Sequence, residues 1–487
     1  MKAAAQEMSG APDAGPAPAG STLHRRLFQR AADYAARFRD EIGQRPPRPV
    51  ISPAQLEALF AGPTPEVGGE ALQVLDALHA AAEPGLTGSA GPRFFGWVIG
   101  ASDPVGVAAD MLASAWGQNA GSFATSPAAA LAEKVAAGWL LDLLQLPKDC
   151  SVGFVTGATM ANFVCLAAAR SAVLHRVGWD VELDGLNGAP PVRLIVGDDA
   201  HTTVFAALRY LGFGERVTRI ATDGEGRMDA QQLALALARG GGPTIVIAQA
   251  GQIHTGAFDP FADIVRLCRQ HGAWLHVDGA FGLWARTVPE LAPLTLALDE
   301  ADSWATDGHK WLQVPYDSGF AIVRDEQAHR RALAITASYL PAATAAEYDP
   351  GAYVPELSRR ARGFATWAQL RCRGRRGVRA LVAQHCALAR RLRQRLAAEA
   401  GIQVLNAVCL NQLIVSFGSG SDAERDALTR RVIARLATDN ICLAGGADFH
   451  GRYVLRVSII ADPLTESDID RLAVAIVSAW RHVEAGP

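Results

Sequence analysis

The sequence has few cysteines and no C-x-x-C pair. Seven cysteines are scattered among 487 residues, and an odd number at irregular spacing argues against a disulfide framework and against a thiolate zinc site. No H-E-x-x-H sequence or other convincing metal-ligand spacing occurs, so no metal is expected. Such cysteines fit a reducing compartment, and a cytoplasmic location is predicted.

Long apolar runs and an excess of basic charge are also missing. No stretch is apolar enough to cross a bilayer. Residues 1–20 are rich in Ala, Gly and Pro and lack the apolar core of a signal peptide, so they are predicted to form a disordered tail. The net charge of −3 argues against a nucleic-acid partner. The remaining composition is that of an ordinary globular protein, long enough for a large catalytic domain with smaller segments.

Short apolar runs alternate with helical stretches in the middle of the chain. The runs predict strands at 152–156, 192–196, 217–221, 244–249, 273–277, 303–305 and 319–323. Alternating strands and helices predict an α/β fold whose mostly parallel central sheet is covered by helices on both faces. Ligands bind such sheets at the carboxyl ends of the strands, so polar residues at these ends are the candidate site residues.

Helical periodicity dominates the N-terminal part of the chain. Helices are predicted over 22–45 and 70–82, with an irregular linker between them that contains Pro53, Pro63 and Pro65. A helical pair of this kind cannot bury both of its faces alone, so it is expected to pack on another chain or domain.

The C-terminal part has helix and strand patterns in separate groups, which predicts a small α+β domain. A helix is expected over 378–400, and strands at 403–408, 411–417 and 453–458 are expected with helices at 423–437 and 466–483. The predicted organisation is a tail (1–20), an N-terminal helical segment (21–100), a large domain (101–375) and a small C-terminal domain (376–487).

A carboxylate ends one of the strands, in W-L-H-V-D-G-A-F at 274–281. Burying Asp278 there is costly unless a cation or a hydrogen-bond donor meets it. The N–H group of a pyridinium ring is such a partner, and a protonated pyridine accepts electrons from a substrate carbanion. Asp278 could equally cap the turn that follows, so this motif alone does not decide between the two interpretations.

A lysine follows the next strand, in A-T-D-G-H-K-W at 305–311. Lys310 lies between His309 and Trp311, and a lysine that is partly desolvated by such neighbours is suited to covalent chemistry with an aldehyde. An isolated lysine is usually a surface charge. An aspartate and a lysine at successive strand ends of one parallel sheet together predict pyridoxal 5′-phosphate (PLP) as the cofactor.

Two strand-to-helix turns supply further candidates. In T-G-A-T-M-A-N at 156–162, Gly157 lets the backbone approach an anion, and Thr159 can donate its hydroxyl beside the free N–H groups of the new helix. In D-D-A-H-T-T at 198–203, His201 can stack on a pyridine ring and donate to a substrate carboxylate. The alternatives are an ordinary Thr-capped helix and a structural histidine at a helix N-terminus. The remaining histidines, among them the following four, are interpreted as surface residues: His24, His79, His271 and His385.

Together these motifs resemble those of the group II PLP-dependent amino-acid decarboxylases, the aromatic-L-amino-acid decarboxylase family of fold type I. The resemblance runs from about residue 92 to the C-terminus. It includes four further sequences, P-R-F-F-G-W (92–97), S-P-A (126–128), T-G-A-F-D-P (255–260) and S-R-R-A-R-G (358–363). The motif set is specific to the family, though not to a substrate.

The resemblance implies a role for each residue at a matching position. By this resemblance, Lys310 binds the cofactor covalently, and the pyridine ring is contacted by Asp278, Ala280 and His201. The phosphate is surrounded by Gly157, Ala158, Thr159 and His309. The aromatic wall of the substrate pocket is formed by Phe94 and Phe95. Family members are homodimers whose N-terminal helices embrace the partner, so a homodimer with shared active sites is expected.

A catalytic acid is also implied, at Tyr339 in A-S-Y-L-P. Decarboxylation needs a proton at the α-carbon after carbon dioxide has left. In the family a tyrosine on a mobile loop supplies it, often from the partner subunit, and relatives that make aldehydes have phenylalanine there. Tyr339 could otherwise be a packing residue, and Tyr348 and Tyr353 are alternative acids.

Some positions depart from the family pattern. Asn119 and Gly121 stand where aromatic-substrate members have apolar or aromatic groups. His254 stands where relatives often have Asn or Thr, and Asp307 replaces an Asn that is common before the H-K pair. These departures bear on the substrate and not on the cofactor.

The predicted reaction is decarboxylation of an L-amino acid to the amine and carbon dioxide, with an aromatic side chain favoured because of Phe94 and Phe95. One alternative is a different outcome on the same fold, namely an aldehyde synthase, an aminotransferase or a carbon–carbon lyase. Another is a non-catalytic relative that binds a partner, against which the retained Lys310, Asp278 and His201 argue.

Overall fold

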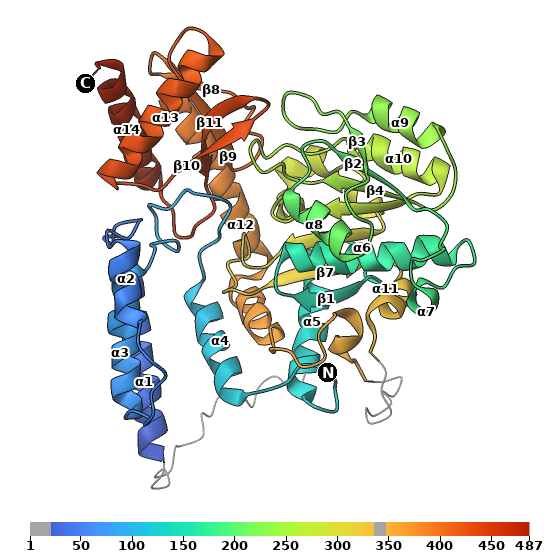
Figure 1. Cartoon of the computed structure of the whole chain (residues 1–487), viewed down its shortest axis with the longest axis horizontal. Helices are drawn as coiled ribbons and strands as arrows, with labels where there is room; N and C mark the ends of the chain where they lie inside the picture. Colours follow the sequence, from blue (N-terminus) through green and yellow to red (C-terminus); the bar gives the residue numbers. More distant parts are fainter. Residues whose placement is uncertain (1–20, 336–346, 487) are drawn as a thin grey trace. The chain divides into compact units, whose positions relative to one another are not determined.

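The computed structural model describes residues 21–335 and 347–486. The chain divides into two compact units, residues 1–88 and 89–487. The first is helical, and the second contains two β-sheets with their covering helices (Figure 1). No helix among the described residues is long and apolar enough to cross a membrane.

Two long helices of the N-terminal unit, α1 (Ser21–Glu41) and α3 (Ala71–Ala82), pack against each other. Arg30 of α1 forms an ion pair with Asp76 of α3 at 2.7 Å, and Tyr34 donates a hydrogen bond to the same carboxylate. The ring of Tyr34 also stacks on His79, with 3.7 Å between the ring centroids. Polar contacts and ring stacking therefore hold the two predicted helices together.

A third helix, α2 (Pro53–Phe60), occupies part of the segment that was predicted to be an irregular linker, so that prediction is wrong. Proline at the first position of a helix loses no hydrogen bond, because the N–H at that position has no partner within the helix. The Ser52 side chain accepts from the backbone N–H of Gln55, and the Gln55 side chain accepts from the N–H of Ser52. This capping box lets Pro53 begin a helix.

The larger sheet of the second unit has seven strands in the order β1-β7-β6-β5-β4-β2-β3. The pairings among β2 to β6 are parallel, whereas β7 is antiparallel to both β1 and β6. The mostly parallel sheet predicted from the sequence is confirmed. The strands span β1 (Ser151–Val155), β2 (Arg193–Gly197), β3 (Thr218–Ile220), β4 (Thr244–Gln249), β5 (Trp274–Asp278), β6 (Ser303–Asp307) and β7 (Gly319–Val323).

Both faces of this sheet are buried. In β4, Ile245 and Ile247 pack on one face, and Val246 and Ala248 pack on the other. Full burial of each isoleucine contributes about 1.5–3 kcal/mol. Residues of α6, α8 and α11 cover the first face, and residues of α5, α9, α10 and α12 cover the second.

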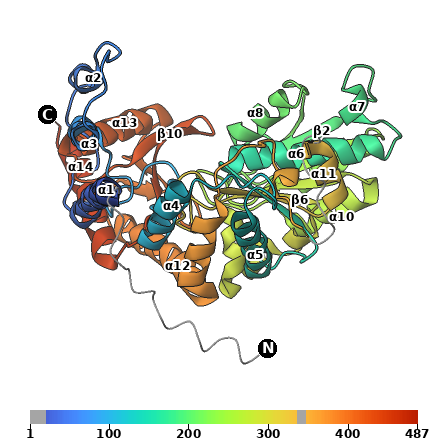
Figure 2. The same ribbon diagram turned by 90° about the horizontal axis from the view of Figure 1, so that it is seen from below.

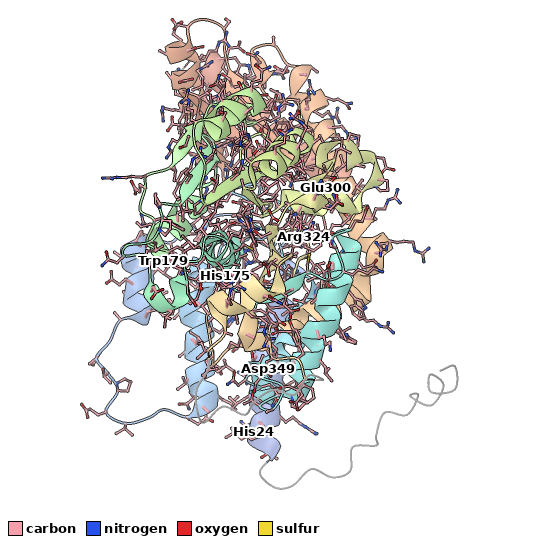
Figure 3. All side chains as sticks on the ribbon, turned by 90° about the vertical axis from the view of Figure 1, so that its right-hand side faces the viewer. His24, His175, Trp179, Glu300, Arg324 and Asp349 are labelled. Carbon is pink, nitrogen blue, oxygen red and sulfur yellow. The ribbon has the colours of Figure 1, made fainter. Side chains whose placement is uncertain are left out.

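The helices of this part of the chain span α4 (Pro104–Trp116), α5 (Pro127–Leu143), α6 (Ala158–His175), α7 (Val181–Asp184), α8 (Thr202–Tyr210), α9 (Ala230–Ala238), α10 (Phe261–His271), α11 (Glu326–Leu333) and α12 (Gly363–Ala397). Helix α6 begins at the carboxyl end of β1 and ends at His175, shortly before Trp179 (Figure 3). Its N-terminus therefore faces the edge where ligands are expected.

The smaller sheet is antiparallel, in the order β10-β11-β9-β8. Figures 1 and 2 show it with α13 and α14 on one side of α12, and the seven-stranded sheet on the other side. Strand β10 has the sequence G-G-A-D-F, which is poor in strand-forming residues and was not predicted. The smaller sheet and its helices span β8 (Ile402–Val404), β9 (Gln412–Phe417), α13 (Asp422–Asp439), β10 (Gly445–Phe449), β11 (Arg452–Ser458) and α14 (Glu466–Glu484).

Helix α12 is interrupted at Gly374, whose φ of 59° is not helical. Glycine adopts this left-handed conformation at little cost, since it has no Cβ. We therefore propose that the boundary between the large and the small domain lies at residue 375, next to this interruption.

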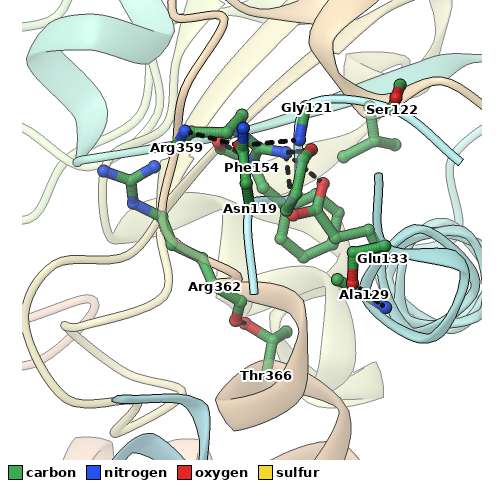
Figure 4. Close-up of polar contacts among 12 residues, drawn as sticks. Asn119, Gly121, Ser122, Ala129, Glu133, Phe154, Arg359, Arg362 and Thr366 are labelled. Carbon is green, nitrogen blue, oxygen red and sulfur yellow. Dashed lines mark hydrogen bonds and ion pairs between the residues drawn. The ribbon is translucent and has the colours of Figure 1, made fainter. Parts of the chain in front are cut away.

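A buried ion pair fixes the segment before α12. Arg359 and Glu133 of α5 lie 2.9 Å apart, and both side chains are fully buried. The guanidinium of Arg359 also donates to the carbonyl groups of Ala120 and Phe154 (Figure 4). Burial raises the pKa of Glu133, and Arg359 opposes that rise. Because breaking a buried pair costs about 3–5 kcal/mol, these contacts hold the S-R-R-A-R-G segment firmly against α5 and β1.

Candidate active site

A cavity of about 300 Å³ lies at the carboxyl ends of β1, β2, β4, β5 and β6. The following residues predicted from the sequence line it: Gly157, Ala158, Thr159, His201, Asp278, Ala280, His309 and Lys310. Residues that sequence reasoning did not single out also line it: Thr156, Thr203, Gln249, Gly251, Ile253, Phe281 and Tyr316. The fold thus brings residues from five strand ends into one site.

Other candidate residues lie elsewhere or outside the described residues. Phe94 stacks on Trp97 with ring centroids 5.8 Å apart, and Phe95 lies in the core of the smaller sheet. Neither lines this cavity, and their place in a substrate pocket stays a prediction. Tyr339 is outside the described residues.

The two alternative acids lie in a different place. Tyr348 and Tyr353 stack on each other with centroids 5.5 Å apart and line a separate cavity. Tyr348 donates to the carbonyl of Val152, and Tyr353 donates to Glu326 at 2.6 Å. Burial raises the pKa of Tyr353 to about 12. Both hydroxyl groups are therefore engaged in contacts within the fold.

Asp278 is buried and is held by two hydrogen bonds. Its carboxylate accepts from the backbone N–H of Ala280 at 3.2 Å and from the side-chain amide of Asn162 at 3.2 Å. It forms no ion pair with any described residue. A buried carboxylate without a cation is costly, so a positively charged N–H donor in the cavity beside Asp278 would be favourable.

The hydrogen bond from Asn162 to Asp278 is the last in a series of hydrogen bonds between side chains of the sheet and α6. Trp274 donates to the hydroxyl of Ser303 at 3.0 Å, and His276 contacts Ser303 and Asn162 at 2.9 Å each. Because the amide nitrogen of Asn162 donates to Asp278, its oxygen must accept from Nε2 of His276. Nδ1 of His276 then accepts from Ser303.

In this series of hydrogen bonds, every donor lies on the side of Trp274 and every acceptor on the side of Asp278. Burial lowers the pKa of His276 to about 3, so its imidazole is neutral and keeps one donor and one acceptor. Donors aligned in series polarise one another in a low-dielectric interior. The series of hydrogen bonds therefore directs the amide donor of Asn162 at the Asp278 carboxylate.

Lys310 lies opposite a second carboxylate. Its Nζ is 2.9 Å from Oδ2 of Asp307 and 6.0 Å from the centre of the Phe281 ring. Gly100 packs against its backbone: a Cβ at Gly100 would lie 2.1 Å from the carbonyl oxygen of Lys310. The lysine thus occupies a fixed place between a carboxylate and an aromatic ring.

The turn between β1 and α6 provides a place for an anion. A Cβ on Gly157 would lie 2.9 Å from Cε1 of His309, so a larger residue here would displace the imidazole. Helix α6 begins at Ala158, whose backbone N–H donates to the carboxylate of Asp307, and His309 stacks on Tyr316 with centroids 4.3 Å apart. Free N–H groups at a helix N-terminus attract phosphate.

His201 caps the N-terminus of α8. Its Nδ1 accepts from the N–H of Thr203 and lies 2.8 Å from the Thr203 hydroxyl. Burial lowers the pKa of His201, so the ring is neutral at pH 7. Because Nδ1 accepts, the proton of the neutral ring is on Nε2, which can donate to a ligand in the cavity.

One charged residue near the site was not predicted. Arg456 of β11 is half-buried, and burial lowers its pKa to about 10. Its positive charge lowers the pKa of both His201 and His254. No ion pair joins it to the described part of the chain. An arginine within an apolar strand pattern gives no signal that would have identified it from the sequence.

His385 is buried, so its interpretation as a surface residue is wrong. Its Nδ1 accepts a hydrogen bond of 2.9 Å from the indole N–H of Trp311, the residue after Lys310. A buried indole needs an acceptor, and His385 supplies one from α12, which is far away in the sequence. His385 thereby helps to position the segment that carries Lys310.

The burial of His385 makes stability depend on pH. Burial lowers its pKa to about 4, whereas the unfolded chain has the ordinary value of 6.5. Between pH 6.5 and 4 the unfolded state binds the proton and the native state does not, so stability falls as pH falls. We expect the free energy of unfolding of the wild type to drop more steeply than that of His385→Gln, by about 1.4 kcal/mol per pH unit. Chemical denaturation at pH 7, 6 and 5 measures this difference; parallel curves would contradict it.

Comparison with known proteins identifies the family. The pyridoxal-dependent decarboxylase conserved domain matches residues 53–417. The chain belongs to this family. Aromatic-L-amino-acid decarboxylase from Sus scrofa is 29% identical over 477 residues, covering 94% of this chain and 95% of the relative. Phenylacetaldehyde synthase from Arabidopsis thaliana is 26% identical and covers 93% of each chain.

A solved structure shows the same fold. The crystal structure of Oryza sativa TDC with PLP and tryptamine has a TM-score of 0.89 at 23% identity, covering 96% of this chain and 99% of that one. PLP fold type I is confirmed, as are the PLP cofactor and the assignment as an amino-acid carboxy-lyase. The relatives also include aldehyde synthases.

The cavity residues fit PLP. Asp278 is a buried carboxylate without a cation and suits a protonated ring nitrogen, and Lys310 is the lysine in the cavity. The N-terminus of α6, with the close approach at Gly157, suits a phosphate group. No cluster of three or more His, Cys, Asp or Glu side chains that could hold a metal ion occurs in the described ranges.

Proposed function

We propose that this decarboxylase acts on an L-amino acid with an aromatic side chain and releases the corresponding amine. The observation that supports the residue assignment best is the meeting of Asp278 and Lys310 in one cavity at neighbouring strand ends. Apolar side chains of Ile253 and Phe281 in the cavity wall suit an aromatic substrate. Relatives that cover 94% of the chain are named aromatic-L-amino-acid decarboxylase.

The residues of the cavity have distinct tasks in this proposal. When bound, PLP supplies an electron-accepting ring to the substrate's α-carbon. Lys310 holds the cofactor covalently, and Asp278 keeps its ring nitrogen protonated. The N–H of Ala158 and the side chains of Thr159 and His309 surround the phosphate.

His201 and the apolar wall position the substrate. With its proton on Nε2, His201 donates to the substrate carboxylate and presents the face of its ring to the cofactor. The imidazole does so as a neutral group, because burial lowers its pKa. Orientation of the carboxylate relative to the ring decides which bond breaks, so this contact selects decarboxylation.

Tyr339 is the proposed acid that returns a proton to the α-carbon. Replacing it with phenylalanine is expected to slow amine formation by roughly 10²-fold or more, since general acid catalysis contributes this much. Dissolved oxygen is then the oxidant, and aldehyde, ammonia and hydrogen peroxide are expected as added products. Amine, aldehyde and peroxide assays on Tyr339→Phe measure the change. Tyr348→Phe serves as the control; if it shows the loss and Tyr339→Phe does not, Tyr348 is the acid.

An aldehyde synthase is the second candidate, supported by the similarity to phenylacetaldehyde synthase. Tyr339 argues against it, since relatives that make aldehydes have phenylalanine at this point. Incubating the purified enzyme with each common L-amino acid, and measuring carbon dioxide, amine and peroxide, separates the two. Amine without peroxide supports the decarboxylase; aldehyde and peroxide from the wild type would overturn it.

The proposed assembly is a homodimer with shared active sites. Helices α4, α5 and α12 expose an apolar face that includes Leu112, Trp116, Leu131, Val135 and Trp367. Such a patch on a globular protein is typical of an interface. Light scattering is expected to give twice the mass of the chain, and a monomeric, active enzyme would refute the dimer. A cytoplasmic location stays a prediction.

A further inference from the structure

We propose that Asp307 lowers the affinity of this enzyme for the phosphate group of PLP. Its carboxylate occupies the place at the N-terminus of α6 where the phosphate would bind. The inference rests on the proposed assignment of the cofactor site. It concerns a carboxylate that the fold places at the proposed phosphate site, and it predicts how much the phosphate group contributes to the affinity for the cofactor.

The carboxylate of Asp307 lies where an anion would be held. It is buried at the end of β6, and its Oδ1 accepts from the N–H of Ala158 at 2.5 Å. The same oxygen is 3.4 Å from Nε2 of His309. These two groups belong to the proposed phosphate surroundings, so Asp307 already contacts two of the N–H groups that would surround a phosphate.

The helix explains why the carboxylate is stable there. The N-cap residue of α6 is Gly157, which has no side chain to accept from the free N–H groups. Asp307 reaches this N-terminus from a neighbouring strand, 149 residues further along the chain. A negative charge at a helix N-terminus is favourable. The interaction that stabilises Asp307 is therefore the one that would stabilise the phosphate.

Phosphate must enter beside this charge. A phosphate monoester carries about two negative charges at neutral pH, and like charges a few ångström apart in a buried site repel strongly. An asparagine has the same shape and can accept from the Ala158 N–H with its amide oxygen, but it has no charge. Asp307→Asn thus removes the repulsion and retains the cap.

A second effect of Asp307 must be separated from the first. Its Oδ2 is 2.9 Å from Nζ of Lys310, so it also holds the lysine that is to react with the aldehyde. Releasing Lys310 changes the affinity for any pyridoxal compound, with or without phosphate. Only the repulsion is specific to the phosphate, and the comparison of PLP with pyridoxal isolates it.

The experiment is a titration of the full-length apoenzyme with PLP and, separately, with pyridoxal. The absorbance of the lysine-bound aldehyde reports both dissociation constants. The ratio of the pyridoxal constant to the PLP constant measures what the phosphate contributes. For Asp307→Asn we expect this ratio to rise by about tenfold or more. The matched control is Asp263→Asn, which removes a surface carboxylate paired with Arg266 on α10 and leaves the ratio unchanged.

The outcomes separate this inference from the cofactor assignment. A ratio in Asp307→Asn that is unchanged or lower than in the wild type overturns the inference, since Asp307 then does not repel the phosphate. A wild type that shows no lysine-bound absorbance, or a Lys310→Ala variant that retains it, overturns the assignment of the site instead. Circular dichroism checks the fold of each variant. If Asp307→Asn does not fold, Asp307→Ser removes the same charge, and its ratio decides.

Discussion

Replacing Lys310 with alanine is expected to lower the rate of decarboxylation by roughly 10³-fold or more, as removal of a covalently acting residue does. The visible absorbance of the lysine-bound cofactor is expected to disappear as well. Lys310 is the lysine that lies in the cavity, with its Nζ between Asp307 and Phe281. Rate measurements on a substrate found in the amino-acid screen, with an absorbance spectrum of the purified variant, test both effects.

The low lysine content of the chain makes the control simple. Its four lysines are Lys2, Lys134, Lys148 and Lys310. Lys134→Ala removes an exposed lysine of α5 and is expected to retain the rate and the spectrum. Borohydride reduction of the wild type followed by peptide mass analysis is expected to label Lys310. A label on another lysine, or an unchanged spectrum of Lys310→Ala, would contradict the assignment.

The large sheet could be predicted because each strand is a short apolar run bounded by turns. Buried strands such as β4 have apolar residues on both faces, so their pattern is visible in the sequence itself. Strand β10 has no such pattern; its two glycines form a strand because β11 pairs with them. Helix α2 was missed for a different reason, since Pro53 was interpreted as a breaker and not as a first helical residue.

The main site residues could be predicted because the carboxyl ends of parallel strands lie at the same edge of the sheet. Asp278 is the last residue of β5 and Lys310 follows β6, and the register pairs Asp278 with Ala305 on β6. Contacts made across long sequence separations could not be predicted. Asn162 reaches Asp278 from 116 residues away, and His385 reaches Trp311 from 74 residues away. Contacts between residues so far apart in the sequence produce no periodic pattern from which they could be predicted.

Two carboxylates in the cavity have opposite surroundings, and this difference defines their roles. Asp278 lies at the end of a series of aligned hydrogen-bond donors that begins at Trp274, and no cation among the described residues forms an ion pair with it. Asp307 accepts a hydrogen bond from the N–H at the start of α6 and forms an ion pair with the ammonium group of Lys310. The first is therefore prepared for a positively charged ligand group. The second is already satisfied by the protein and competes with a negative group.

The second large effect is expected for Asp278→Asn. An asparagine can still accept from the amide of Asn162, but it cannot balance a positive charge on the ring nitrogen of the cofactor. The ring then stays neutral and accepts electrons poorly, so kcat is expected to fall by roughly 10²–10³-fold, the usual loss when one charge-stabilising group is removed. The cofactor is still expected to attach to Lys310, because the lysine and the phosphate surroundings are unchanged.

Separate measurements of kcat, cofactor affinity and thermal midpoint distinguish this role of Asp278 from a structural one. A role in the chemistry predicts a large loss of kcat with a similar PLP affinity and a similar midpoint. A structural role predicts a loss of the midpoint and of cofactor binding together. Asp263→Asn, at the surface, is the matched control for a lost carboxylate. If Asp278→Asn retained its kcat, the aligned donors from Trp274 to Asn162 would orient a side chain that has no part in the reaction, and the assignment of the ring nitrogen's partner would have to be abandoned.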